Sequence, residues 1–339
     1  MQTSDRSAQL YQKIGGIIEA GNLNLDHVDE SLNAAVLMGA KISSKSLSLA
    51  LDATARIIHA EPLTAKHEAI LESIILGNGL RPAYDIARDS FDQLPSVWSD
   101  LNDARADLTP VIRSVGRLNV SGHPKVSYAG TAFVCGVDLL LTNRHVAEEF
   151  MKAGSSDITL EFKPGMSAVV DLKQEVGSNE SILLEPTGEA TISMEWDVAL
   201  LKVKSLPAEI APVRLAAVQP SAIKDKTAAV IGYPAFDENE NLIEQIAIFR
   251  GLFNKKRLQP GKFLGIGPVM SYGRNVTALM HDCSTLGGNS GAAVVDVESH
   301  KVLGVHFCGI SGVANYCIPS WELARTEAFT SMRGKMSFC

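Results

Sequence analysis

The chain has 339 residues, of which 46% are hydrophobic and 20% are charged, and its formal net charge is −7. These values are typical of a soluble globular protein that is long enough for two or three hydrophobic cores. The negative charge argues against a general nucleic-acid or anionic-membrane surface. No apolar run approaches the ~18 to 20 residues of a membrane span, and the N-terminus lacks the apolar segment of a signal peptide. We therefore expect a cytoplasmic protein.

Residues 5–92 have the hydrophobic spacing of α-helices. Apolar residues recur every three to four positions in four successive stretches that Gly and Pro residues separate. The stretches contain Leu10, Ile14, Ile17 and Ile18; Leu25, Val28, Leu32 and Val36; Leu47, Leu51, Ile57 and Ile58; and Ile70, Leu71, Ile74 and Ile75. A fifth, shorter helix is expected to begin near Pro82, because proline suits the first helical turn, and to carry Ile86 and Phe91. Short connections predict a small antiparallel bundle for residues 1–92.

Residues 93–116 form the junction with the second part of the chain. One helical face carries Trp98, Leu101, Arg105, Leu108 and Ile112. Pro110 is expected to end or kink this helix. The apolar face predicts a connecting helix that packs on the following domain, not a flexible linker.

From residue 117 to 339 the pattern changes to short apolar runs between Gly, Pro, Asn and Asp residues, which is typical of an all-β domain. The expected strands are 130–135, 138–142, 157–162, 168–176, 197–203, 228–232, 244–251, 262–265, 276–280, 292–296, 301–307 and 313–318. The segment from Ser320 to Met332 is expected to be a C-terminal helix. The five cysteines have no CxxC spacing, so we expect free thiols, mostly buried, and neither a disulfide nor a metal site.

Three motifs in this half of the chain carry residue types used in nucleophilic catalysis. His145 follows the apolar run Leu-Leu-Leu-Thr, Asp197 precedes another apolar run, and Ser290 lies in Gly-Asn-Ser-Gly. A serine hydroxyl is a poor nucleophile near pH 7, so it needs a base and donors for the oxyanion that it forms. Taken singly, each motif is as well explained by a surface turn or a satisfied polar residue.

The order His, Asp, Ser and the motifs TNRHV, WDVALL and STLGGNSG together resemble the chymotrypsin-like serine peptidases, in their bacterial trypsin-like and glutamyl-endopeptidase branch. The resemblance covers about residues 116–328. It implies a double β-barrel with the active site between the barrels. It also implies His145 as general base, Asp197 as the residue that orients it, and Ser290 as nucleophile, with the N–H groups of Gly288 and Ser290 as the oxyanion hole.

The same resemblance implies a substrate pocket for the P1 side chain that Ser284, Thr285 and His306 line. A hydroxyl and an imidazole could bind a substrate carboxylate, most strongly if the imidazole is protonated. Acidic P1 residues and small or apolar P1 residues remain equal alternatives, and a basic P1 is disfavoured. Asn289 stands where secreted members have the aspartate that pairs with a newly cut N-terminus, so we expect no such activation step.

The sequence thus predicts a cofactor-free serine endopeptidase with an N-terminal helical bundle. A catalytically silent scaffold and an esterase-like hydrolase are the alternatives. The bundle is similar in size and position to the helical modules that accompany trypsin-like peptidases in bacterial conflict systems. We therefore expect residues 1–92 to bind a partner protein or a protein substrate, and a stabilising cap is the alternative.

Overall fold

The computed structural model describes residues 81–237, 242–310 and 314–339, together with isolated positions between 52 and 64. The first four predicted helices lie outside the described residues except for those isolated positions. The predicted bundle therefore stays a prediction.

The chain divides into two compact units. One comprises Met1–Ala83 and Phe236–Phe253, and the other comprises Tyr84–Ala235 and Asn254–Cys339. Both sheets described below belong to the second unit, which we call the catalytic unit. Residues 84–92, which we assigned to the bundle, lie in the catalytic unit.

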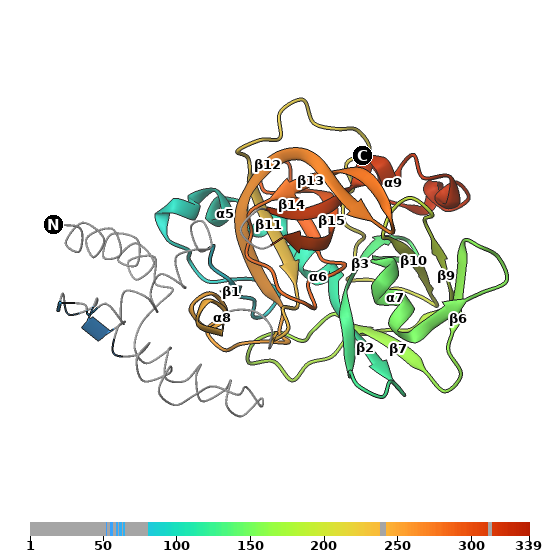
Figure 1. Ribbon diagram of the computed structural model, residues 1–339, viewed down its shortest axis with the longest axis horizontal. Helices are drawn as coiled ribbons and strands as arrows, with labels where there is room; N and C mark the ends of the chain where they lie inside the picture. Colours follow the sequence, from blue (N-terminus) through green and yellow to red (C-terminus); the bar gives the residue numbers. More distant parts are fainter. Residues whose placement is uncertain are drawn as a thin grey trace. The chain divides into compact units, whose positions relative to one another are not determined.

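The first sheet of the catalytic unit has nine antiparallel strands in the order β5-β6-β9-β10-β4-β3-β2-β7-β8. Figure 1 labels β2, β3, β6, β7, β9 and β10 of this sheet. Its strands are β2 (Val115–Ser121), β3 (Tyr128–Gly136), β4 (Leu139–Thr142), β5 (Met151–Ala153), β6 (Thr159–Phe162), β7 (Ser167–Asp171), β8 (Leu183–Leu184), β9 (Pro186–Ile192) and β10 (Ala199–Val203). A cluster of buried side chains that includes Leu118, Leu140 and Leu201 packs against it. Strands β2, β5, β8 and β9 were not predicted.

The second sheet has seven strands, and six of them form a closed ring. β12 pairs with both β11 and β13, and β13 pairs with β16, so the ring runs β12-β11-β14-β15-β16-β13. Its strands are β1 (Tyr84–Asp85), β11 (Thr227–Gly232), β12 (Arg257–Ser271), β13 (Arg274–His281), β14 (Ala293–Asp296), β15 (Lys301–Ile310) and β16 (Ala314–Pro319). Closure leaves no unpaired sheet edge in the ring.

The junction packs on both sheets, as expected, but not as one helix. It forms the 3-10 helix η1 (Ser96–Trp98), α5 (Ser99–Asp103) and α6 (Arg105–Ser114). Leu101, Leu108 and Ile112 are fully buried and share a core cluster with strand residues of both sheets. Pro110 lies inside α6 and does not end it.

The expected fifth helix near Pro82 is wrong. Tyr84 and Asp85 form β1, which pairs with Leu258 and Arg257 of β12. Arg88 and Asp89 then have positive φ angles of 54° and 60°. An α-helix cannot contain such residues, because the left-handed conformation breaks its hydrogen-bond ladder.

A buried group of charges holds this segment against the sheets. The ammonium of Lys256, with no exposed area, donates to the carbonyl oxygens of Ile112 (2.9 Å) and Leu172 (2.6 Å) and lies 3.4 Å from Glu175 Oε1. The other oxygen of Glu175 accepts the backbone N–H of Asp89 at 3.0 Å. Burial lowers the pKa of Lys256 to about 8, against the opposing charge of Glu175. No sequence pattern predicted this network, because its members come from four separate segments of the chain.

Two further predictions about elements need correction. The expected strand 244–251 is the helix α8 (Leu242–Phe249), whose apolar residues Leu242, Ile246 and Phe249 have helical spacing. The expected C-terminal helix is only α9 (Ser320–Leu323), followed by the 3-10 helices η2 (Glu327–Phe329) and η3 (Arg333–Lys335). No helix among the described residues is long and apolar enough to cross a membrane.

We predict that Ile86→Ala lowers the free energy of unfolding by about 2 to 5 kcal/mol, because Ile86 is fully buried in the core cluster that includes α5 and α6. Val97→Ala is the matched control, since Val97 is 67% exposed and its truncation should change stability by no more than about 0.5 kcal/mol. Urea unfolding of the full chain measures both. Equal stabilities for the two variants would show that residues 84–92 are not part of the catalytic unit's core.

Candidate active site

His145 and Asp197 meet because their strands are neighbours. β4 ends at Thr142 and leads into α7 (Arg144–Phe150), and β10 begins at Ala199, which pairs with Thr142. The start of α7 is thereby placed beside the residues that precede β10. The sequence predicted only a turn before His145, and the structure has a short helix there.

The carboxylate of Asp197 binds His145 with both of its oxygens. Oδ2 lies 2.6 Å from His145 Nδ1, and Oδ1 accepts the backbone N–H of His145 at 3.0 Å. Asn143 Nδ2 donates to the backbone oxygen of Asp197 at 2.8 Å. Asp197 is buried, whereas the side chain of His145 is 43% exposed. The free N–H groups in the first turn of a helix bind anions, so α7 itself helps to hold this carboxylate.

Ser290 lies in the loop between β13 and β14, and β3 of the first sheet holds that loop. The N–H of Thr131 donates to the oxygen of Ser290 at 2.8 Å. A Cβ atom on Gly130 would lie 2.9 Å from Ser290 O and 2.9 Å from a methyl group of Val146, the residue after His145. Gly130 therefore allows the serine loop and α7 to approach each other.

The peptide groups around Gly288 are fixed by hydrogen bonds to their carbonyl oxygens. Ala235 N–H donates to Gly287 O at 2.6 Å, and Thr131 Oγ1 donates to Gly288 O at 2.7 Å. In a trans peptide the N–H and C=O groups point in opposite directions. The bond to Gly287 O therefore turns the N–H of Gly288 away from Ala235.

Asn289 is held in a neutral pair of amides. Its Nδ2 donates to Gln259 Oε1, and Gln259 Nε2 donates to Asn289 Oδ1, each at 3.0 Å. Both side chains are fully buried. Asn289, the residue before Ser290, thus has its side-chain hydrogen bonds satisfied within the catalytic unit by a neutral partner.

Thr285, one of the predicted P1-pocket residues, already uses its hydroxyl proton in a hydrogen bond within the protein. Thr285 Oγ1 donates to Asn315 Oδ1 at 2.7 Å, and Asn315 Nδ2 donates to Cys283 O at 2.7 Å. The proton of the Thr285 hydroxyl is thereby used, so this oxygen can only accept a further bond. Ser284 is partly exposed and lies in the same loop.

His306 is buried beside a second histidine. Its Nδ1 lies 3.3 Å from Nε2 of His281, whose Nδ1 has no hydrogen-bond partner. Burial lowers the pKa of His281 to about 3, and burial followed by the neighbouring His281 and His145 lowers the pKa of His306 well below its usual value. Both rings are therefore neutral near pH 7, so the stronger binding of a carboxylate that a protonated His306 would give is not expected.

The tautomers of this pair follow from the unpaired nitrogen. A buried N–H without a partner is rarer than an unpaired acceptor. We therefore assign the unpaired Nδ1 of His281 as the acceptor, so its Nε2–H donates to His306 Nδ1. The proton of His306 is then on Nε2.

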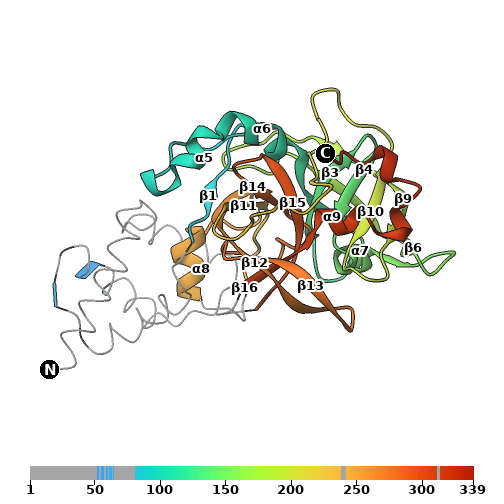
Figure 2. The same ribbon diagram turned by 90° about the horizontal axis from the view of Figure 1, so that it is seen from above.

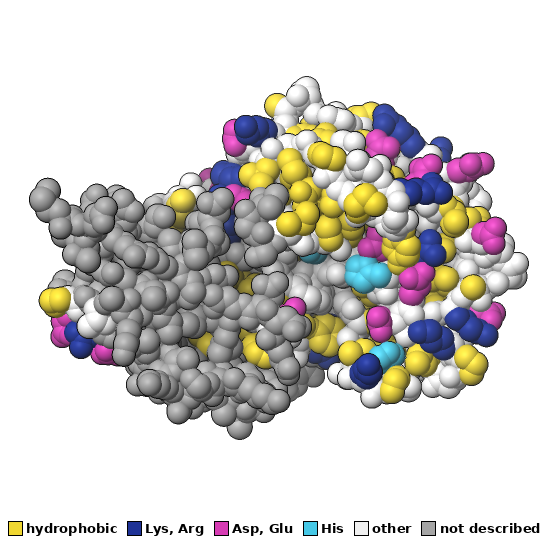
Figure 3. All heavy atoms as spheres, in the orientation of Figure 1, with side chains coloured by type: hydrophobic (Ala, Val, Ile, Leu, Met, Phe, Trp, Pro, Cys, Tyr) yellow, Lys and Arg dark blue, Asp and Glu magenta, His cyan; other side chains and the backbone are white. Residues whose placement is uncertain are grey.

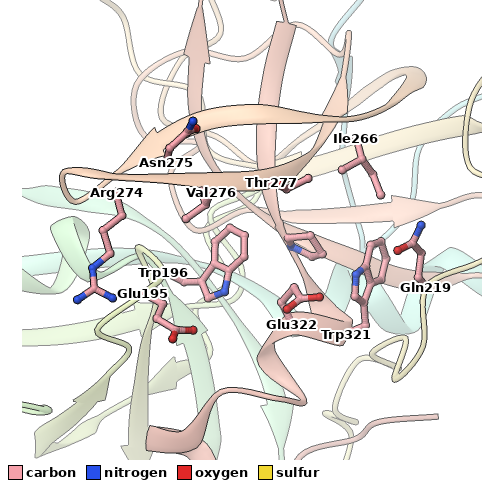
Figure 4. A pocket seen from close by; sticks show the side chains of 11 residues that line it. Glu195, Trp196, Gln219, Ile266, Arg274, Asn275, Val276, Thr277, Trp321 and Glu322 are labelled. Carbon is pink, nitrogen blue, oxygen red and sulfur yellow. The ribbon is translucent and has the colours of Figure 1, made fainter.

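A pocket of about 440 Å³ lies next to the residues before Asp197 (Figure 4). The side chains of Trp196, Trp321 and Val276 supply apolar walls, and Glu195, Arg274 and Glu322 supply charges. Arg274 extends from β13 toward Glu195 in this view. Over the parts of the chain that are described, no group of three or more His, Cys, Asp or Glu side chains is arranged to hold a metal ion.

The sequence predicted His145, Asp197 and Ser290 as candidate site residues but missed the residues that hydrogen-bond to their loops. Thr131, in the GTAFVCG segment before His145, carries much of this support, because it bonds to Gly288, Ser290, Thr142 and Tyr233. A buried threonine within an apolar strand was the available signal. No sequence pattern indicated the supporting roles of Gln259 and Ala235, because their hydrogen-bond partners lie 30 or more residues away in the chain.

Residues 130–305, which are 176 of the 339 residues, match the model of the trypsin-like peptidase domain. A protein of Lysobacter enzymogenes named as a probable serine protease is 29% identical over 294 residues, which are 76% of this chain and 74% of that protein. Among solved structures, the active form of the Rv3671c protease of M. tuberculosis is 22% identical, with a TM-score of 0.44 over 66% of this chain and 82% of that one. Deg5 is 19% identical, with a TM-score of 0.48 over 72% of this chain and all of that one.

We predict that Gly288→Ala and Gly287→Ala differ sharply in stability. Gly288 has a φ of 83°, and an added Cβ would lie 2.4 Å from Tyr233 O, whereas a Cβ on Gly287 would meet nothing within 4 Å. Strain and the clash should cost the Gly288 variant about 2 kcal/mol or more, and the Gly287 variant should stay within about 0.5 kcal/mol of the parent. Thermal unfolding of both variants measures the difference. Similar midpoints would contradict the loop conformation described above.

Proposed function

Because this chain belongs to the trypsin-like peptidase family and is a serine peptidase, we propose that it cleaves protein substrates with His145, Asp197 and Ser290 as its catalytic triad. The observation that carries the proposal is the double contact of Asp197 with His145, at 2.6 Å to Nδ1 and 3.0 Å to the backbone N–H. This contact fixes both the ring and its tautomer, with the Nδ1 proton on the side of Asp197. Nε2 is then left without a proton and can act as a base.

In this mechanism the Ser290 hydroxyl attacks the carbonyl carbon of the scissile peptide while His145 Nε2 takes its proton. The tetrahedral oxyanion accepts hydrogen bonds from the N–H groups of Gly288 and Ser290. The C–N bond then breaks as His145 gives its proton to the leaving amine, and an ester of Ser290 remains. Water, deprotonated by the same ring, hydrolyses the ester and restores the serine. Asp197 stabilises the imidazolium in both steps and does not take its proton.

The support for the oxyanion hole is the pair of hydrogen bonds that Gly287 O and Gly288 O accept from Ala235 and Thr131. They hold the loop before substrate arrives, so little reorganisation is needed as charge develops on the substrate oxygen. Donors fixed in this way contribute most to transition-state stabilisation. The neutral Asn289–Gln259 pair supports a loop that needs no newly cut N-terminus to order it.

We predict that Ser290→Ala and His145→Ala each abolish peptide hydrolysis, and that Asp197→Asn lowers kcat by about 10⁴ because the ring is no longer held in the right tautomer. The measurements are kcat/KM on a short peptide and covalent labelling with a fluorophosphonate. Ser299→Ala, at a serine bonded to Asp296 away from the triad, is the control and should react like the parent. Peptide cleavage by Ser290→Ala above a few per cent of the parent rate would refute the triad.

The P1 pocket in this proposal is lined by Ser284, Thr285 and His306. The Nε2–H of neutral His306 is a donor, and the oxygen of Thr285 is an acceptor, because its proton is bound to Asn315. These groups suit a P1 side chain that ends in a carboxyl or carboxamide group. Small or apolar P1 residues are the alternative.

We expect kcat/KM to be higher for Glu or Gln at P1 than for Ala, Leu or Arg in matched peptides. The ratio of Glu to Gln should stay flat between about pH 6 and 8, because the lowered pKa of His306 keeps it neutral throughout that range. His306→Ala should remove the preference while fluorophosphonate labelling of Ser290 continues. A preference for Arg or Leu, or a Glu preference that rises steeply as the pH falls to 6, would contradict the neutral pocket.

The proposal extends to the rest of the chain on the evidence of its sequence. The four helices expected before Pro82 recruit a partner protein or a substrate, and the peptidase acts in a bacterial defence or regulatory pathway in the cytoplasm. Helical periodicity before a peptidase domain supports this extension. A pull-down of the full chain with Ser290→Ala, compared with Ser299→Ala as a control that makes the same serine-to-alanine change away from the triad, would identify a trapped substrate.

A further inference from the structure

The tip of the β12–β13 hairpin carries a residue that its turn does not favour. Ser271 and Arg274 are the last pair of the ladder, so Tyr272 and Gly273 form a two-residue turn. Both have positive φ, 44° and 74°. Such a turn favours asparagine followed by glycine, and a bulky residue at the first position is strained. Backbone strain that local geometry does not explain points to a role for the side chain.

The Tyr272 side chain contacts two residues of α7. Its hydroxyl donates to Glu148 Oε2 at 2.7 Å, and the guanidinium carbon of Arg144 lies 4.4 Å from the centre of its ring. Arg144 Nε in turn donates to Glu148 Oε1 at 2.7 Å. Each of the three side chains thus contacts the other two, in a closed set of one cation–π contact and two charge-assisted hydrogen bonds.

The phenol remains a donor at any working pH. Tyr272 is 41% exposed, and its partial burial, followed by the hydrogen bond to Glu148 and the negative charges of Asp197 and Glu148, raises its pKa far above the usual value, against the opposing charge of Arg144.

The contact joins the element that carries His145 to the sheet that carries Ser290. His145 directly follows Arg144 in α7. The hairpin belongs to the second sheet, and β13 leads directly into the Ser290 loop. Figures 1 and 2 both show the end of this hairpin beside α7. On the face seen in Figure 3, hydrophobic side chains gather over β12 and β13, and the exposed Met270 lies two residues before the tip.

We propose that Tyr272 is a positioning residue for catalysis, which holds α7 through Arg144 and Glu148 so that His145 stays aligned with Ser290. This inference rests on the proposed function, because it takes His145 as the base. Displacement of a catalytic group by about 1 Å is enough to lower a rate by about 10²-fold. Tyr272 itself does not take part in the chemistry.

The test is Tyr272→Asn in the full chain. Asparagine suits the turn, so the thermal midpoint should be unchanged or higher, while kcat and kcat/KM on a short peptide both fall by about 10- to 100-fold and KM changes by less than about twofold. A fall in kcat and kcat/KM together is the signature of an interaction that acts in the transition state. Tyr272→Phe keeps the ring over Arg144 and should recover part of the loss. Met270→Ala, on the same hairpin, should behave like the parent.

Other outcomes separate the possible errors. If Tyr272→Asn keeps full kcat, or if KM rises while kcat does not change, Tyr272 does not position His145. If stability and activity fall in parallel, its role is structural and the inference is overturned. If His145→Ala is as active as the parent, the proposed function fails, and the inference fails with it. If His145→Ala is inactive and Tyr272→Asn loses kcat while its stability is kept, both the proposed function and the inference are supported.

Discussion

The site depends on the hydrogen bonds by which β3 of the first sheet holds the loop of the second. Thr131 bonds to Ser290 through its N–H and to Gly288 through its hydroxyl, and its own carbonyl accepts the hydroxyl of Thr142 at the end of β4. Thr142 leads into α7 and pairs with the strand after Asp197. A few buried bonds therefore link all three motifs. The bond between Thr142 and Thr131 is buried, so losing one of its partners leaves an unsatisfied group and costs more than the bond contributes.

The segment that precedes the junction helices also helps to hold the catalytic unit together. The segment of residues 84–94 adds β1 to the second sheet and buries Ile86 and Phe91 in the core shared with the junction helices. The Lys256–Glu175 pair fixes the same segment. An ion pair buried this deeply adds little net stability, but removing one partner is costly, so it enforces one arrangement of the chain.

The polar groups around the predicted P1 pocket show how packing changes the chemistry that residue types suggest. A histidine and a threonine are natural ligands for a carboxylate. Here His306 is buried against His281 and is neutral, and the Thr285 proton is bound to Asn315. The same residues therefore present one donor and one acceptor, not two donors. This difference follows from Asn315 and His281, neither of which is adjacent to the motif.

The sequence alone determined the β-rich half of the chain and the positions of most of its strands, and it supplied His145, Asp197 and Ser290 as the candidate residues of the proposed triad. Such features follow from local alternation, turn residues and short motifs, so they can be read without neighbours in space. The tertiary structure alone decided that residues 84–92 belong to the catalytic unit, that 242–249 is a helix, and which residues support the proposed triad. An apolar run of four to eight residues fits a strand or a buried helix equally well, and its packing partners decide between them. The partners of Thr131, Gln259 and Tyr272 lie far away in sequence, so only the folded chain reveals their contacts.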